Sequence, residues 1–577
     1  MDNSLEIRFW PLVPCLQEGA DRIPLAIEMP VGEDSFSAFS FTLQIENLGR
    51  VIDCLEGEPI RSLSQTTGFL RFEQEITLTK PLKTGSGYGL YLTITFPDGS
   101  NTEAKSAIDV EPNQVRYGFL TGFKTEDSVS RNSALDFLLQ QHCTHVQFYD
   151  WSYRPHQYEI EPIQFDQGKK YRDLMGKSVD LSVVKQSVEG LQHHGMKALA
   201  YGAVYAASKE YLQDHPEQGL YAFGGKPIDL IDKFFIMNIA EGNQWRKRIL
   251  DQYCYATDTL GFDGIHMDTY GYPKIAFDNE QKPVYLDREF VSLINAWAKH
   301  GNENIFNNVG GWPADLTAKA NQKAVYIEVW DPHTQYRHLR QLIQNHRGFG
   351  KPVVLAAYSR SFKESGTLDR KKALASTCLL MASTYAQGAT PLLFGENGGI
   401  LTQPYYVDYT PLRQEERNLL TSYTDFSIQY CQLLFGNDLV DVTESFAFGE
   451  NREFEFSIPP QENTDLSEIG ISFEGLPDTL WPIVHMDKKL IVINLINLIG
   501  QKDSLWNLEK EPLDKEAGIT IQIPPYSPSM HFFMASPQID NGRAHKLLGR
   551  QAEGLRGMAW EITIDALPVW TLVWAEL

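Results

Sequence analysis

Residues 261–271 read Gly-Phe-Asp-Gly-Ile-His-Met-Asp-Thr-Tyr-Gly, a short strand pattern that ends in a carboxylate. Because side chains alternate along a strand, His266 and Asp268 share one face while Ile265 and Met267 share the other. An ionised aspartate is costly to bury unless it has a partner or a chemical role. A helix cap or a salt bridge is the structural alternative, but an acid at the end of a buried strand is typical of the catalytic edge of a parallel barrel. We therefore expect Asp268 to be catalytic.

Similar runs recur on both sides of this strand and alternate with amphipathic helical stretches, for example over residues 131–141, 181–195, 243–260 and 287–300. Eight cycles of strand and helix predict a (β/α)8 TIM barrel over residues 113–435, with its catalytic groups at the carboxyl ends of the strands. The expected strands are residues 116–119, 144–149, 197–201, 264–268, 304–309, 324–329, 352–357 and 390–394.

The two ends of the chain show a different pattern, in which short alternating runs are separated by turn residues. Residues 1–112 predict an immunoglobulin-like β-sandwich, and residues 436–577 predict a Greek-key β-sandwich. The fold class is therefore multidomain, α/β plus β, with the barrel in the centre. The clearest terminal runs are residues 36–45, 68–79, 87–96, 452–458, 489–496, 518–525, 531–534 and 560–576.

Composition excludes several function classes. The 51 basic and 74 acidic residues give a net charge of -23, which would repel nucleic acid and anionic membranes. No run approaches the roughly 18 apolar residues of a membrane span. The six cysteines have no C-x-x-C pair and no histidines at ligand spacing, so we expect free thiols, no metal and no cofactor. The opening residues lack a signal peptide pattern, which predicts a cytoplasmic protein, or a secreted one whose signal is missing from this sequence.

A second strand-end acid lies in the sixth predicted strand, where residues 324–332 read Ala-Val-Tyr-Ile-Glu-Val-Trp-Asp-Pro. Parallel barrel strands are normally almost continuous apolar runs, so Glu328 is unusual there. Tyr326 and Trp330 share its face and should desolvate it, which raises the pKa of a carboxyl group as a general acid requires. A buried structural ion pair is the alternative to a catalytic Glu328.

A third carboxylate, Asp150, ends the second predicted strand, whose last residues, 147–151, read Gln-Phe-Tyr-Asp-Trp. The three acids should meet in one pocket. Glycosidic cleavage needs two of them, one to donate a proton and one to stabilise or attack an oxocarbenium-like carbon, while the third can hold sugar hydroxyls. A divalent cation is the alternative occupant, and the lack of histidines at short spacing argues against it.

Further candidates lie near these strand ends. Asn308 and Trp312 follow the fifth strand, where the amide can bond a sugar and the indole can stack on one, although Gly310-Gly311 also favours a plain turn. Glu396 follows the eighth strand, and the absence of Lys-Ser/Thr after it rejects nucleotide binding. The expected substrate-binding residues are Tyr149, Asp150, Trp151, His266, Tyr270, Asn308, Trp312, Tyr326, Trp330 and Glu396.

The motifs at residues 147–151, 261–268 and 326–330 together resemble glycoside hydrolase family 66, the dextranases and cycloisomaltooligosaccharide glucanotransferases. The resemblance implies retaining, endo-type cleavage of α-1,6-glucosidic bonds in dextran or isomaltooligosaccharides by double displacement. It also implies that Asp268 is the nucleophile and Glu328 the acid/base. Asp150 matches an aspartate that binds sugar hydroxyls where the bond is cut.

Three alternatives remain. Cyclising transferases of the family carry a carbohydrate-binding insert within the barrel, whereas here the segment from Lys351 through the eighth strand is continuous and short, so the dextranase type is expected. An α-galactosidase-like barrel would place Asp rather than Glu328 on the sixth strand. A non-catalytic carbohydrate-binding protein would gain nothing from a buried, unpaired glutamate.

Overall fold

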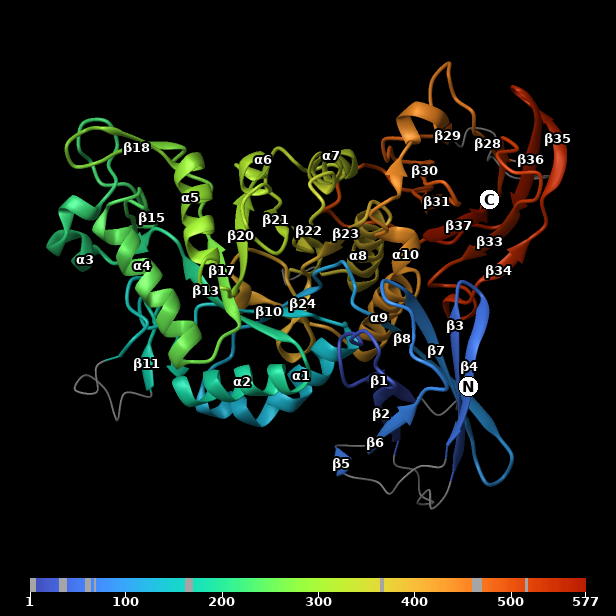
Figure 1. The fold of residues 1–577 in the computed structure, drawn as a ribbon, viewed down its shortest axis with the longest axis horizontal. Coiled ribbons are helices and arrows are strands. Elements are labelled where there is room, and N and C mark those ends of the chain that lie inside the picture. The colour runs from blue at the N-terminus through green and yellow to red at the C-terminus, as the bar shows by residue number, and fades with distance from the viewer. Residues whose placement is uncertain are drawn as a thin grey trace.

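The computed structural model describes residues 7–30, 39–57, 64–66, 69–160, 170–363, 368–458, 470–513 and 517–577. These residues form a central region of helices and parallel strands, with an N-terminal and a C-terminal β region that both lie to its right in Figure 1. The domain boundaries after residues 112 and 435 stay predictions. Among the described residues, no helix has both the length and the apolar character needed to cross a bilayer.

A curled sheet of parallel strands forms the centre, and each strand pairs with the next one along the chain. Every predicted strand of this region overlaps an observed one. Its first seven strands are β9 (Tyr117–Leu120), β10 (His145–Phe148), β13 (Lys197–Ala203), β17 (Gly264–Asp268), β20 (Glu303–Val309), β21 (Val325–Glu328) and β22 (Val353–Ala356).

The eighth predicted strand is split in two. β23 (Ala389–Pro391) pairs with β22, and β24 (Phe394–Gly395) pairs with β9 at the other end of the sheet. β25 (Gly399–Ile400) and β26 (Thr410–Pro411) then extend the sheet beyond β24 as antiparallel strands. Closure of this curled sheet into a (β/α)8 barrel stays a prediction.

Helices connect the parallel strands and lie around the outside of the sheet, with α1 and α2 along the lower side of the central region in Figure 1. α2 shows why such a segment is helical: the Asp180 side chain accepts a hydrogen bond from the Ser182 backbone N–H, and Val184, Val188 and Leu191 form its buried face. The helices are α1 (Arg131–Gln140), α2 (Leu181–His193), α3 (Lys209–Asp214), α4 (Gln244–Cys254), α5 (Leu286–Ala298), α6 (Ala314–Thr317), α7 (Tyr336–Arg347), α8 (Arg370–Tyr385), α9 (Gln414–Gln429) and α10 (Cys431–Leu434).

Short strands in the loops at the carboxyl ends of the sheet were not predicted. They have only two or three residues each, too few for a periodic pattern to be recognised. Several of them, together with α3, form the end of the molecule that lies farthest from the two β regions (Figure 1). They are β11 (Lys170–Arg172), β12 (Ser178–Asp180), β14 (Ala206–Ala207), β15 (Asp229–Leu230), β16 (Phe234–Ile236), β18 (Ile275–Phe277) and β19 (Pro283–Tyr285).

The N-terminal β region contains two sheets that share one hydrophobic core, in which Leu25 and Ile27 of one sheet pack with Leu43 and Leu90 of the other. Of its predicted runs, residues 36–38 and 68 lie outside the described residues. The first sheet has the order β1 (Arg8–Pro11), β2 (Arg22–Pro30), β6 (Phe69–Thr77), β5 (Ser64–Thr66). The second has the order β4 (Arg50–Gly57), β3 (Ser40–Asn47), β7 (Gly87–Thr95), β8 (Asn101–Asp109).

The C-terminal β region also contains two sheets, and it corrects one prediction. Residues 560–576 are two strands in different sheets, because the chain leaves the ladder around Pro568, which has no N–H to donate. One sheet has the order β27 (Val440–Asp441), β30 (Thr479–Met486), β31 (Leu490–Asn497), β37 (Trp570–Glu576), β33 (His531–Ala535), β34 (His545–Leu547), and β29 (Gly470–Ile471) pairs with β30. The other has the order β28 (Glu455–Ser457), β32 (Ile519–Ile523), β36 (Gly557–Ile564), β35 (Arg550–Gly554).

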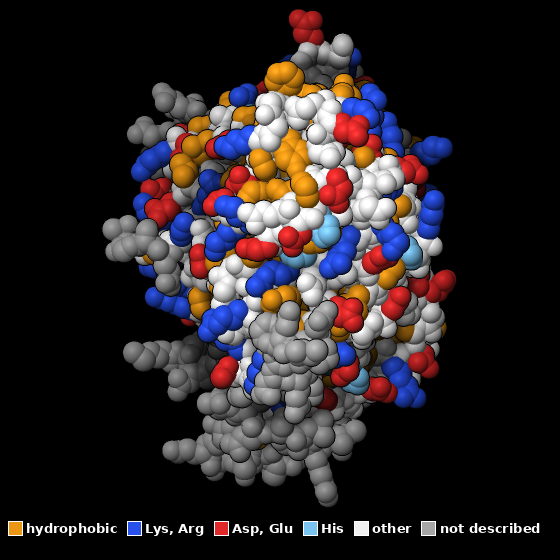
Figure 2. Space-filling model, turned by 90° about the vertical axis from the view of Figure 1, so that its left-hand side faces the viewer, with side chains coloured by type: hydrophobic (Ala, Val, Ile, Leu, Met, Phe, Trp, Pro, Cys, Tyr) orange, Lys and Arg blue, Asp and Glu red, His pale blue; other side chains and the backbone are white. Residues whose placement is uncertain are grey.

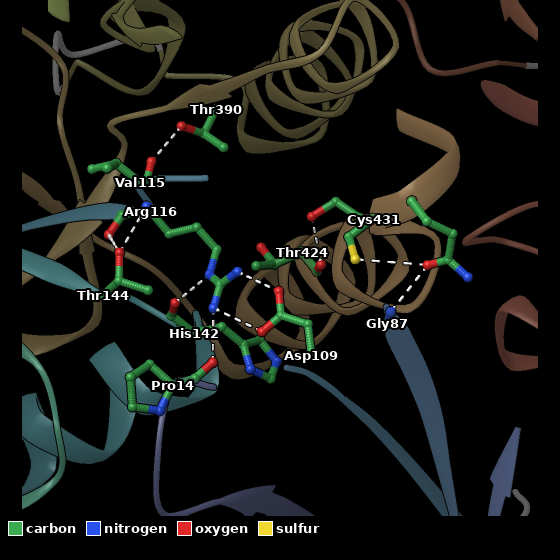
Figure 3. Close-up of polar contacts among 12 residues, drawn as sticks. Pro14, Gly87, Asp109, Val115, Arg116, His142, Thr144, Thr390, Thr424 and Cys431 are labelled. Carbon is green, nitrogen blue, oxygen red and sulfur yellow. Dashed lines mark hydrogen bonds and ion pairs between the residues drawn. The ribbon is translucent and has the colours of Figure 1, made fainter. Parts of the chain in front are cut away.

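A buried ion pair fixes the N-terminal region to the amino-terminal end of the central sheet (Figure 3). Arg116, directly before β9, donates to both carboxylate oxygens of Asp109 at the end of β8, at 2.6 and 3.2 Å. The other hydrogen bonds of its guanidinium group go to the carbonyl oxygens of His142 and Pro14, at 2.6 and 2.8 Å. Three separate segments are thus held by one guanidinium group.

Removing one partner of this pair should leave the other charge buried and uncompensated. We expect Arg116→Met to lower the free energy of unfolding by about 3–5 kcal/mol, measured by urea denaturation. Because the two side chains interact, Arg116→Met combined with Asp109→Leu should lose less than the sum of the single variants. Additive losses would show that the pair does not stabilise this junction.

Candidate functional site

A cavity of about 450 Å³ opens where β10, β13, β17, β20 and β21 end, a size within the usual range of ligand sites. Asp150, Asp268 and Glu328 all line it. Parallel strands carry their carboxyl ends to the same edge of a sheet, which explains why three acids far apart in the sequence meet here. Tyr149, His266, Tyr270 and Trp330 line the same cavity.

One amide group bridges two of the acids. The side-chain nitrogen of Asn307 on β20 donates to Asp268 at 2.7 Å and to Glu328 at 3.0 Å. The bonded oxygens of the two carboxyl groups are therefore held within two hydrogen-bond lengths of each other. Inverting glycosidases need a separation of roughly 6.5–9.5 Å to fit a water molecule, whereas retaining ones need about 5–5.5 Å.

Two tyrosines supply the remaining hydrogen bonds of this pair. The Tyr201 hydroxyl donates to the other oxygen of Asp268 at 2.6 Å, and the Tyr358 hydroxyl donates to the other oxygen of Glu328 at 2.6 Å. Each carboxyl oxygen thus has a neutral donor, which lets it be buried without a cation.

Burial and mutual repulsion set the protonation of the pair. Burial, followed by the charge of Glu328, raises the pKa of Asp268 to about 7, and the hydrogen bonds from Tyr201 and Asn307 oppose this shift. Burial also raises the pKa of Glu328 above its ordinary range, against the hydrogen bonds from Tyr358 and Asn307. Two adjacent carboxyl groups that both resist ionisation favour a state in which they share one proton.

Asp150 is held at the cavity by a left-handed backbone conformation, with φ of 50°. The ammonium group of Lys177 donates to the carbonyl oxygens of Tyr149 and Thr121, at 3.2 and 3.1 Å. It therefore links the backbone directly after β10 to the backbone directly after β9. Burial raises the pKa of Asp150 to about 6, while the charge of Lys177 lowers it. Asp150 can therefore accept hydrogen bonds from a ligand near neutral pH.

His266 forms part of the cavity floor and is neutral at physiological pH. Burial lowers its pKa to about 3. Its Nδ1 atom lies 2.8 Å from the Tyr117 hydroxyl, and its ring stacks beside that of Tyr201 at 6.3 Å between centroids. The imidazole therefore acts in packing and hydrogen bonding here, not as a charge.

Five other expected substrate-binding residues do not line the cavity, and each makes a different contact. Trp151 is buried and donates to the Tyr201 carbonyl oxygen. Trp312 packs against Phe290. Glu396 accepts hydrogen bonds from the backbone N–H groups of residues 121 and 122, at 3.0 Å each. Nothing in the cavity supports a substrate contact for these three.

The other two of the five lie on or beside strands of the sheet. Asn308 faces away from the cavity because it alternates with Asn307, and it bonds the Tyr326 carbonyl oxygen at 2.8 Å. The Tyr326 side chain lies deeper, with its hydroxyl 3.0 Å from that of Tyr406. Both side chains are buried under the cavity wall.

Asn307, Tyr201 and Tyr358 were missed as site residues. No sequence signal placed Asn307, because the pairing of Val309 with Glu328, which sets the face of β20 that meets the cavity, is known only from the packed sheet. The same holds for Tyr201 and Tyr358, whose hydrogen bonds to the acids depend on pairing between strands that are distant in the sequence. Among the described residues, no group of three or more His, Cys, Asp and Glu side chains is arranged to hold a metal ion.

The sequence profile of glycosyl hydrolase family 66 matches residues 17–574. The chain belongs to glycosyl hydrolase family 66. The match covers the central region together with nearly all of both β regions, so the family resemblance of the strand-end motifs is confirmed.

Named relatives and one solved structure agree with this assignment. A cycloisomaltooligosaccharide glucanotransferase of Niallia circulans is 27% identical over 338 residues, which cover 53% of this chain and 34% of that protein. A dextranase of Streptococcus salivarius is 23% identical over 514 residues, which cover 77% of this chain and 60% of the dextranase. The chain thus spans less than two thirds of the length of the curated relatives it matches.

The solved structure is that of a Paenibacillus sp. cycloisomaltooligosaccharide glucanotransferase in complex with cycloisomaltoheptaose. It matches with a TM-score of 0.81 at 18% identity and covers 99% of both chains. At this identity the likeness establishes a shared fold for the family 66 chain.

The raised pKa of Asp268 predicts a pH-dependent stability. Between its ordinary value of 3.8 and about 7, the folded protein holds this proton more tightly than the unfolded chain does, so the free energy of unfolding falls as pH rises. Asp268→Asn removes this pH-dependent loss, and the stability of the variant relative to wild type should grow from pH 4 to pH 7 by on the order of 3 kcal/mol. Thermal melts across this range provide the measurement.

The matched control is Asp98→Asn, because hydrogen bonds from Ser100 lower the pKa of this exposed aspartate. A lowered pKa contributes stability that is already complete above the ordinary value of 3.8, so the stability of this variant relative to wild type should stay nearly constant from pH 4 to pH 7. The same trend in both variants would contradict the assignment for Asp268.

Proposed function

We propose that this protein is a retaining, endo-acting glycoside hydrolase that cleaves α-1,6-glucosidic bonds of dextran or isomaltooligosaccharides by double displacement. The observation that carries the proposal is the Asn307 bridge, which holds Asp268 and Glu328 at the close spacing that a covalent intermediate requires. Family 66 membership and the dextranase and glucanotransferase names of the relatives support the substrate class.

In this proposal the central region is a closed (β/α)8 barrel over residues 113–435, flanked by β-sandwich domains at residues 1–112 and 436–577. Closure is supported by the strand order. β23 pairs with β22 at one end of the sheet, β24 pairs with β9 at the other, and only residues 392–393 separate β23 from β24. Catalytic groups then lie at the carboxyl ends of the barrel strands, as in other enzymes of this architecture.

The first step forms a glycosyl-enzyme. Glu328 gives its proton to the glycosidic oxygen while an oxygen of Asp268 attacks the anomeric carbon. The bond from that carbon to the leaving glucan breaks, the leaving chain departs with the proton on its oxygen, and an ester bond to Asp268 forms. The pKa values of both carboxyl groups are raised, and in this step the one proton that the pair shares lies on Glu328 while Asp268 is ionised.

The second step returns the enzyme to its starting state. The carboxylate of Glu328 now takes a proton from water, the water oxygen attacks the anomeric carbon, and the bond to Asp268 breaks. Two inversions restore the α configuration. Asn307 and Tyr201 stabilise the carboxylate of Asp268 as it leaves, because both donate to it.

Asp150 is assigned to the sugar whose bond is cut. It lines the same cavity, and burial with the nearby Lys177 leaves it able to accept hydrogen bonds from hydroxyl groups. Tyr149 beside it stacks on Tyr406 at 4.6 Å between ring centroids, which fixes an aromatic wall next to Asp150.

Cyclising transglycosylation is the second candidate, favoured by the names of the glucanotransferase relatives. In that reaction the far end of the same glucan, instead of water, attacks the glycosyl-enzyme. The segment between β22 and β23 favours hydrolysis, because it lacks room for the inserted domain expected of a cyclising transferase. Its described residues form a short turn and α8, and the whole segment is shorter than a domain of about 50 residues or more.

Product analysis separates these functions. We expect linear isomaltooligosaccharides from dextran, and early proton NMR spectra should show the α anomer before mutarotation. Asp268→Gly should lose at least about a thousandfold in kcat because the nucleophile is gone. Cyclic products, each one water lighter by mass spectrometry, would favour the transferase, and a β anomer formed first would exclude double displacement.

Glu328→Gln tests the proton donor. Cleavage of glucan, a poor leaving group, should fall by about 10²–10⁴-fold, whereas attack on an α-glucosyl fluoride should be much less affected because fluoride needs little protonation. Since the same group serves as base in the second step, the variant should accumulate glycosyl-enzyme, seen as a burst and as added protein mass.

The control for this test is Asp331→Asn, an exposed carboxylate three positions along the chain that does not line the cavity. It should leave both rates unchanged. Equal damage to fluoride and glucan in Glu328→Gln, without a burst, would move the acid role to another residue.

A further inference from the structure

The hairpin between β15 and β16 contains an unusual turn. Ile231 and Asp232 are its central residues, and both have φ of 53°. The turn is closed by a hydrogen bond from the Lys233 N–H to the Leu230 carbonyl oxygen at 3.2 Å. Two successive residues with positive φ form the turn type that normally selects Asn-Gly, and a β-branched isoleucine is strongly disfavoured there.

Ile231 is also disfavoured by its exposure. Its side chain is 60% exposed, yet it lines the cavity that contains the three acids. Backbone strain destabilises the folded protein, and the exposed Ile231 side chain contributes little burial to offset it, so asparagine or glycine would be favoured at this position. Strain of this kind persists at positions where the side chain serves a ligand.

Three further apolar side chains line the cavity beside Ile231. We call Leu230, Ile231, Phe234 and Tyr272 the rim platform. Tyr272 comes from the loop after β17, and its hydroxyl donates to the Asp229 carbonyl oxygen at 3.0 Å, which ties that loop to the hairpin. The platform is therefore a built surface that joins two separate loops.

The platform belongs to a larger apolar surface. Figure 2, which faces the end of the molecule with α3, β15 and β18, shows hydrophobic side chains gathered in its upper part above a more charged area. The large exposed hydrophobic residues in these loops are Phe223, Ile231, Tyr272, Ile275 and Tyr285. Apolar surface that continues out of a catalytic cavity is suited to the part of a ligand that extends beyond the reacting bond.

We propose that the rim platform binds a glucose residue of the chain beyond the bond that is cut, and so sets a preference for longer substrates. The inference rests on the proposed function. Pyranose rings present apolar C–H faces, and every α-1,6 linkage adds an exocyclic methylene group, so an α-1,6-glucan offers apolar surface at each residue. The uncharged side chains of the platform match that surface, whereas the cavity acids match hydroxyl groups.

Ile231→Asn tests this inference. Asparagine accepts positive φ, so the turn should be retained with an equal or higher melting temperature while the apolar contact is lost. We expect the ratio of kcat/KM on isomaltoheptaose to that on isomaltotriose to fall by about tenfold, which corresponds to about 1.4 kcal/mol. Ile231→Gly, which also accepts this conformation, should lower the ratio in the same way.

The matched control is Asp232→Asn, which changes the neighbouring residue of the same turn at the same φ. The Asp232 side chain is exposed, pairs with Lys209 at 3.6 Å and does not line the cavity. This variant should keep the wild-type ratio. A fall in both variants would assign the effect to the turn and overturn the role of the Ile231 side chain.

Other outcomes are equally decisive. An unchanged ratio in folded Ile231→Asn would overturn the platform while leaving the hydrolase assignment intact. Wild-type protein that cleaves neither dextran nor either isomaltooligosaccharide would refute the proposed function itself, and the platform with it. A change from dimer to monomer in Ile231→Asn, measured by light scattering, with an unchanged ratio, would assign the apolar surface to a second copy of this chain.

Discussion

Two carboxyl groups of like charge, Asp268 and Glu328, lie side by side in a buried cavity, and this unfavourable pairing is the constraint on which the site depends. Like charges held within two hydrogen-bond lengths destabilise each other, and burial adds a desolvation penalty. Asn307, Tyr201 and Tyr358 offset both effects with neutral donors. A cation would remove the repulsion but would also hold both groups ionised, whereas neutral donors leave one proton to be exchanged.

This arrangement requires a rigid sheet beneath it. The two acids and their donors come from neighbouring strands or the residues directly after them, so a shift in strand register would separate them. Packing between the β regions and the central sheet contributes to that rigidity. The Arg116–Asp109 pair lies at the amino-terminal end of the sheet, opposite the cavity. Side chains at that end serve the stability of the fold.

Strain lies at the carboxyl-terminal edge of the same sheet. Asp150 has φ of 50° directly after β10, and Ile231 has φ of 53° in a loop above the cavity. Both side chains line the cavity from positive φ, a conformation that aspartate tolerates but that a β-branched isoleucine adopts rarely. The stable amino-terminal end of the sheet thus supports a carboxyl-terminal edge at which a few side chains are held in place for a ligand.

The sequence alone determined where the strands of the central region lie along the chain and which acids follow them, because apolar runs and strand-end carboxylates are local patterns. Glu328 and Asp268 were found this way. Local patterns could not reveal the donors, since a hydrogen bond from Tyr201 to Asp268 depends on strand pairing between distant segments. Nor could they place Asn307 ahead of Asn308, because one step along a strand reverses the side chain and only the packed sheet decides which face meets the cavity.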